Sequence, residues 1–136
     1  MRPIVLDANI AFRGLVAGRA EIARRLLQAG PGDFFAPFHL LAELFEHKER
    51  ILELTALPPE DIVSAFHHLA ESITFIREAA IPLGIWIEAH RLCRGVDADD
   101  TPYVALALHL EADLWTDDAE LKTGLRARGF DHFFKA

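Results

Sequence analysis

VDADDTPYVALALHLEADLWTDDAEL, residues 96–121, carries the clearest structural signal in the chain. Apolar side chains fill nearly every position of 103–110, which predicts a helix that is buried on all sides. Residues 113–116 follow as a short strand, and residues 119–128 form a second helix that ends at Gly129. Acidic residues stand at the start of the buried helix and at the end of the strand. In an open α/β sheet such positions line the ligand crevice.

Short runs of β-branched and aromatic residues alternate with helical patterns along the rest of the chain. A helix that begins at Phe38 has apolar residues at a spacing that predicts one buried stripe, namely Leu41, Leu44, Phe45, Ile51 and Leu52. Further strands are predicted at 3–7, 33–36, 73–76 and 132–134, with a turn after the first, and further helices at 20–28, 59–71 and 82–93. This alternation predicts an α/β fold, a three-layer sandwich with a central, mostly parallel sheet.

Length and composition indicate a single domain that spans residues 1–136. Of these 136 residues 51% are hydrophobic, which is enough for a sizeable core. The one cysteine, Cys93, has no partner for an internal disulfide, as is usual in a reducing compartment. The apolar runs are far shorter than the roughly 20 residues that span a bilayer. We therefore expect a cytoplasmic protein without a membrane segment.

Three aspartates are expected to converge at the crevice. Asp7 ends the first strand, Asp118 follows the strand at 113–116, and Asp100 directly precedes the buried helix, which its side chain would cap. Carboxylates that meet there would repel one another unless a cation neutralised them. A hard divalent ion, Mg²⁺ or Mn²⁺, prefers oxygen ligands of this kind. Each aspartate also has a purely structural interpretation, as a helix cap or a turn residue.

A fourth acid, Glu43, belongs to the helix that begins at Phe38. It shares helical spacing with Glu46, His47 and Arg50, so these four side chains could also form a solvated, ion-paired face. The residues alone leave both interpretations open.

The formal net charge of −7 argues against a protein that coats nucleic acid, because such proteins bind phosphates through an excess of Lys and Arg. A nuclease is not excluded, since divalent ions would cancel much of the charge in an acidic site. A phosphatase of the haloacid-dehalogenase type would need a second aspartate two positions after Asp7, where the chain has Asn9. Neither glycine-rich nucleotide-binding motif occurs.

Together, IVLDANI at 4–10, LAELFEHK at 41–48 and the segment 96–121 make the chain resemble PIN-domain proteins, especially the small stand-alone ribonucleases of the VapC toxin type. The resemblance implies four site acids, which are both metal ligands and catalytic residues: Asp7, Glu43, Asp100 and Asp118. It also implies three auxiliary residues: Asn9, Asp97 and Thr116. The T-x-D spacing after the last strand selects Asp118 over Asp117, which competes with it for the same role.

The activity that the resemblance implies is hydrolysis of phosphodiester bonds in single-stranded RNA by a water that Mg²⁺ or Mn²⁺ activates. One ion would be held by Asp7, Asp100 and Asp118, and a second would lie near Glu43. The implied partners are the RNA substrate, an antitoxin protein and a second copy of the chain in a homodimer. The alternative is a catalytically silent module of the same fold that binds or scaffolds a partner.

Overall fold

Four parallel strands in the order β3-β2-β1-β4 form the centre of the protein. The computed structural model describes residues 2–18, 24, 26 and 34–135. The strands are β1 (Ile4–Leu6), β2 (Phe34–Pro37), β3 (Ile73–Ile76) and β4 (Asp113–Trp115). Val5 of β1 lies opposite Phe35 of β2 on one side and Leu114 of β4 on the other. The predicted strand at 132–134 is reduced to one parallel bridge, between Phe133 and Leu114.

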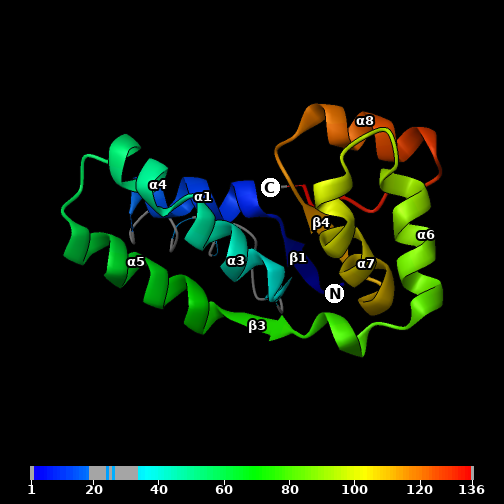
Figure 1. Ribbon diagram of the computed structural model, residues 1–136, viewed down its shortest axis with the longest axis horizontal. Helices are drawn as coiled ribbons and strands as arrows, with labels where there is room; N and C mark the ends of the chain where they lie inside the picture. Colours follow the sequence, from blue (N-terminus) through cyan, green and yellow to red (C-terminus); the bar gives the residue numbers. More distant parts are fainter. Residues whose placement is uncertain (1, 19–23, 25, 27–33, 136) are drawn as a thin grey trace.

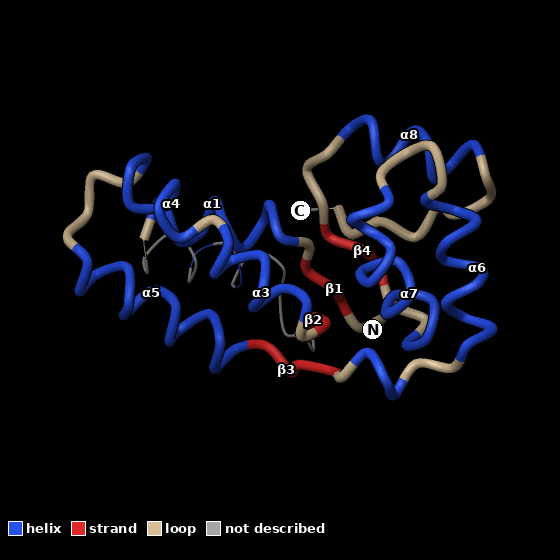
Figure 2. Tube along the Cα trace, in the orientation of Figure 1, coloured by secondary structure: helices blue, strands red, loops and turns tan. Residues whose placement is uncertain are grey.

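Helices cover both faces of this sheet, so the predicted three-layer α/β sandwich is confirmed (Figures 1 and 2). One group connects β1, β2 and β3 and comprises α1 (Ala8–Ala17), α3 (His39–Glu46), α4 (Lys48–Leu54) and α5 (Pro59–Ser72). The other group comprises α6 (Leu83–Cys93), α7 (Thr101–Leu110) and α8 (Ala119–Ala127). The connection from β3 to β4 crosses the sheet in the direction opposite to that of the earlier connections. Because crossovers between parallel strands are right-handed, the helices of this connection lie on the other face of the sheet.

Helix α1 replaces the turn that was predicted directly after Asp7. The Asp7 carboxylate accepts a hydrogen bond from the Ile10 backbone N–H at 3.0 Å and so caps the helix. Ile10 and Leu15 lie on the buried side of the helix. The helix ends at Gly18, whose φ of +99° favours glycine. The helix predicted over 20–28 lies largely outside the described residues.

The predicted helix from Phe38 is two helices, because the backbone leaves the helical path at His47, where φ is −101° and ψ is 14°. The buried face of the two helices is narrower than the predicted stripe. Leu44 and Ile51 are buried, whereas Phe45 is 68% exposed and Leu52 is 50% exposed. The prediction of one continuous buried stripe was therefore wrong at Phe45 and Leu52.

Helix α7 is buried as its sequence predicts. Residues 103–107 are at most 1% exposed, and the helix packs against α6 and against strands β1, β2 and β4. It ends at Glu111, which adopts left-handed backbone angles of 52° and 45°. Because only two residues separate the end of α7 from the start of β4, the first turn of α7 lies toward the carboxyl end of β4. Among the described helices, none is long and apolar enough to cross a bilayer.

Candidate metal-binding site

The carboxyl ends of β1 and β4 lie side by side at one edge of the sheet. From β1 the chain continues to β2 and β3 on one side, and it then returns to place β4 on the other side of β1. Asp7 comes directly after β1, and its backbone N–H donates to the Trp115 carbonyl of β4 at 3.2 Å. Asp118 lies three residues beyond Trp115. Crevices of this kind are where open α/β sheets bind ligands.

Three carboxylates gather at this edge and form what we call the three-acid cluster: Asp97, Asp100 and Asp118. One oxygen from each lies within 4.8 Å of the others. Oxygen ligands surround Mg²⁺ at about 2.1 Å and Ca²⁺ at up to about 2.6 Å, so oxygens on opposite sides of an ion are about 4 to 5 Å apart. The donor set therefore fits a hard divalent ion in both spacing and chemistry.

Local hydrogen bonds position two members of this cluster. Asp118 caps α8, because its carboxylate accepts from the Leu121 N–H at 3.1 Å, and its own N–H donates to the Thr116 hydroxyl at 3.1 Å. Asp97 begins the short 3-10 helix η2 (Ala98–Asp100) and accepts from the Asp99 N–H at 3.0 Å. Each of these carboxylates thus has one oxygen tied to the backbone.

Asp7 is 2% exposed, and it is near enough to Asp118 of the three-acid cluster to be affected by its charge. Burial raises the pKa of its carboxyl group to about 6, against the lowering effects of hydrogen bonds with Thr116 and the Ile10 N–H, and the negative charges of Asp117 and Asp118 raise it further. Asp7 is therefore held in a place where its ionised form is costly without a cation.

The ionised form of Asp100 is costly for the same reasons. Burial raises its pKa to about 8, and the charges of Asp97, Asp7 and Glu43 and a hydrogen bond with Asp97 add to that effect. Two further acids expected at the site, Asp7 and Glu43, therefore act electrostatically on Asp100. In the absence of a cation, Asp100 is expected to retain its proton at neutral pH.

The prediction that the Asp100 side chain caps the buried helix was wrong. Asp100 occupies the N-cap position, but its backbone is helical, with φ of −86° and ψ of −2°, and its side chain makes no capping hydrogen bond. An N-cap side chain reaches the first turn only from an extended backbone. Here η2 runs directly into α7, so the Asp100 carboxylate is left for the three-acid cluster.

Glu43 is held by two residues that sequence reasoning missed. Its Oε1 atom accepts a hydrogen bond from the Tyr103 hydroxyl at 2.6 Å and lies 3.1 Å from His39 Nε2. Burial and the Glu43 carboxylate both raise the pKa of Tyr103 strongly, so the hydroxyl stays protonated as a donor. A tyrosine in an otherwise apolar buried helix was the available signal, because a buried hydroxyl needs a partner.

Tyr103→Phe is expected to lower the free energy of unfolding by about 1.5–3 kcal/mol, the usual contribution of a hydrogen bond to a charged group. The ring and its packing are retained, so the loss reports the hydroxyl contact with Glu43. Urea unfolding followed by circular dichroism measures it. A Tyr103→Phe protein as stable as the wild type would show that this contact contributes nothing to the fold.

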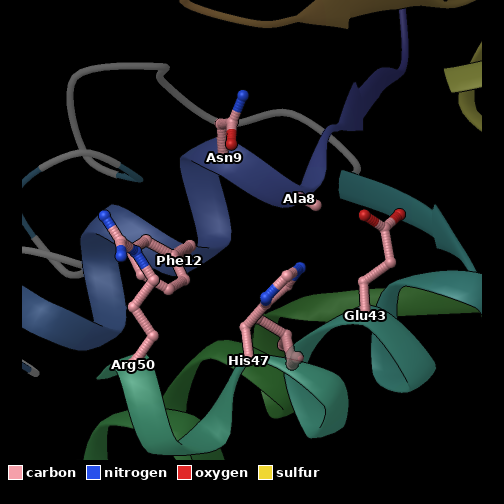
Figure 3. A pocket seen from close by; sticks show the side chains of 7 residues that line it. Ala8, Asn9, Phe12, Glu43, His47 and Arg50 are labelled. Atoms are coloured by element: carbon pink, nitrogen blue, oxygen red, sulfur yellow. The ribbon is translucent and has the colours of Figure 1, made fainter. Parts of the chain in front are cut away.

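The other aspartates of this region are placed differently. Asp117 points to α1, where its carboxylate accepts a hydrogen bond from the Arg13 guanidinium at 2.7 Å. Asp99 is exposed and is not part of the three-acid cluster. Asn9 is exposed on α1 and lines a cavity of about 180 Å³ beside Glu43 (Figure 3).

Comparisons with known proteins agree with this fold. The family profile described as PIN domain matches residues 5–133. Among solved structures, one chain of the crystal structure of VapBC2 from Rickettsia felis bound to a DNA fragment from their promoter is similar, with a TM-score of 0.65 and 16% sequence identity. The match covers 88% of this chain and 91% of that chain. A comparison with curated protein sequences gave no match.

Proposed function

Because the chain belongs to the PIN-domain family, we propose that it is a metal-dependent endoribonuclease that hydrolyses phosphodiester bonds of single-stranded RNA. The observation that carries the proposal is the convergence of Asp97, Asp100 and Asp118 at the carboxyl edge of the sheet, next to buried Asp7. The raised pKa values of Asp7 and Asp100 mean that their ionised forms are costly, as is expected where a cation is to be bound. This cost argues against a purely structural role for these two residues.

In this proposal the acids hold Mg²⁺ or Mn²⁺, with Asp7, Asp100 and Asp118 as principal ligands, Asp97 as an auxiliary ligand and Glu43 at the edge. When bound, a divalent ion lowers the pKa of a coordinated water and offsets charge on the phosphoryl oxygens. Thr116 fixes the backbone before Asp118.

Other residues of the chain then hold the acids in place. Tyr103 and His39 both contact Oε1 of Glu43, which leaves Oε2 available to a water or to a second ion. Asp97 lies within hydrogen-bonding reach of Asp100 and is the more exposed of the two. We propose that Asp97 accepts a proton from the site or contacts a bound water there.

The direct test incubates the purified protein with single-stranded RNA oligonucleotides in Mn²⁺, in Mg²⁺ and in EDTA. Cleavage in the metal buffers and none in EDTA is expected. Binding of Mn²⁺ without cleavage of any RNA would favour the alternative, a silent binding or scaffold module of the same fold. Absence of Mn²⁺ binding would contradict the metal site itself.

We further propose that the chain acts as the toxin of a toxin–antitoxin pair, in line with its resemblance to VapC-type proteins. A protein partner is supported by an apolar groove of about 330 Å³ between α1, α3, α4 and α5. Phe45 and Val63 line it and are 68% and 54% exposed. Exposed apolar surface of this kind commonly marks a protein interface.

Homodimer formation is the second partner proposal. Leu40 is fully buried, but Phe38 is 42% exposed and Leu54 is 51% exposed, so apolar side chains remain available at the surface. Light scattering at micromolar concentration is expected to give twice the monomer mass of 15.2 kDa. A mass equal to the monomer value would exclude the homodimer.

A further inference from the structure

A small cavity lies next to Glu43, between α1 and the α3–α4 pair, and we call it the flanking pocket (Figure 3). Its volume is about 180 Å³, and its chemically distinctive lining residues are Phe12, Glu43, His47 and Arg50. In Figure 3 these side chains point into the space between α1 and the two helices below it. The pocket thus opens beside one of the acids that raise the pKa of Asp100.

The flanking pocket is lined by the guanidinium of Arg50 and by the rings of Phe12 and His47. Arg50 is exposed and makes no ion pair or hydrogen bond with any residue that the structure describes. The Phe12 and His47 rings meet edge to face with centroids 6.5 Å apart. The backbone break at His47 places His47 at the end of α3 and Arg50 on α4, so the two helices contribute different groups to one cavity.

The positive and aromatic groups of the flanking pocket differ from the acidic residues of the rest of the site. The three-acid cluster and Asp7 are negative, as is the whole chain with its net charge of −7, so an RNA backbone is repelled wherever no cation screens it. The Arg50 guanidinium, which pairs with none of the described residues, can bind a phosphate in a planar, two-pronged contact. Aromatic rings beside it provide the surfaces on which bases of single-stranded nucleic acids stack.

We infer that the flanking pocket is the subsite for the nucleotide adjacent to the scissile phosphate, with Arg50 on its backbone phosphate and the Phe12–His47 pair against its base. This inference rests on the proposed ribonuclease function and goes beyond it by assigning residues that select single-stranded RNA. The small size of the cavity limits the occupant to one nucleotide. A base held in a duplex cannot reach rings in such a recess, so unpaired RNA is the substrate class.

Binding of a fluorescently labelled single-stranded RNA, measured by anisotropy in Mg²⁺, tests the assignment. All proteins carry Asp118→Asn, which is expected to slow cleavage by about 10² or more, so that little RNA is cleaved during the measurement, and to leave the pocket intact. Arg50→Ala is expected to raise Kd at least about tenfold. It should also reduce the slope of log K against log salt by about 0.7, the value for one phosphate contact to a single strand.

Lys48→Ala is the matched control. It removes the same charge two residues away on the same helix, but the Lys48 ammonium lies over the Phe45 ring at 4.0 Å and does not line the pocket. It is expected to leave Kd within about twofold of the parent. Phe12→Leu should weaken binding several-fold without changing the salt slope, because it removes a stacking surface and no charge.

Equal effects of Arg50→Ala and Lys48→Ala would overturn the inference, as would a parent protein that binds no RNA. The outcome is separable from that of the proposed function. If the wild type cleaves RNA and Arg50→Ala leaves KM unchanged, only the pocket assignment fails. If RNA binding depends on Arg50 but no RNA is ever cleaved, only the ribonuclease proposal fails.

Discussion

Asp7→Asn, Asp100→Asn and Asp118→Asn are each expected to reduce Mg²⁺- or Mn²⁺-dependent cleavage of single-stranded RNA by about 10² or more. Each substitution removes a negative charge from a set of ligands that act together, while the size of the side chain hardly changes. Initial rates at saturating RNA, with the metal concentration varied, measure the effect. If an acid only binds the metal, a high metal concentration should restore the rate of its variant. If its charge also stabilises the reaction, the rate should stay low at high metal concentration.

Asp99→Asn is the control for this series. Asp99 neighbours Asp100 and carries the same charge, but it is exposed and lies outside the three-acid cluster. Its substitution should leave the rate within about twofold, the scale of an exposed charge change. Asp97→Asn is expected to fall between Asp99→Asn and Asp100→Asn. Full activity in all three principal variants would refute the site.

Without metal, the protein is expected to lose stability as the pH rises from about 4 to about 8. Burial raises the pKa of Asp7 to about 6 and that of Asp100 to about 8, from an ordinary value of 3.8. Folding therefore favours the protonated forms, so their contribution is complete below about pH 4 and is lost as the pH passes through each raised value. For Asp7 alone the difference corresponds to about 3 kcal/mol at 1.36 kcal/mol per pKa unit.

Urea unfolding in EDTA at pH 5 and pH 8 measures this loss. Asp7→Asn serves as the reference, because its amide does not ionise while the histidines of the chain titrate as before. The wild type should lose more stability than Asp7→Asn between the two pH values. Identical losses in the two proteins would show that Asp7 is not strained in the metal-free fold.

Mn²⁺ is expected to restore the stability lost at pH 8. Binding to the folded state contributes about 2.7 kcal/mol at 100 times Kd. The effect should be smaller at pH 5, where Asp7 and Asp100 are largely protonated. Asp7→Asn should reduce the gain at pH 8. A melting temperature that millimolar Mn²⁺ leaves unchanged at pH 8 would speak against any metal site in the cluster.

The sequence predicted the parts of this fold that follow from local pattern. Helix α7 could be identified because its apolar residues leave almost no polar face, and β4 because it lies between that helix and an acidic turn. Helix α1 was missed, since Gly14 and a short apolar pattern resemble a turn. The break at His47 was missed as well, because the sequence from His39 to Leu54 has the composition of one continuous helix.

Positions of the acids could be predicted only to the level of the sheet edge. Parallel strands bring their carboxyl ends together, so the convergence of Asp7 and Asp118 followed from topology. The membership of Asp97 in the three-acid cluster depends on the turn η2, whose backbone angles no pattern specified. The contact between Tyr103 and Glu43 joins residues 60 positions apart, and such pairings arise from tertiary packing alone.

Asp7 and Asp118 have double duties, since each caps a helix with one carboxylate oxygen while belonging to the acidic site. Asparagine caps helices about as well as aspartate. One base change converts an aspartate codon into an asparagine codon. A lineage of this protein can therefore lose its chemistry in a single mutational step and retain its shape, so descendants that only bind their partners are within easy evolutionary reach.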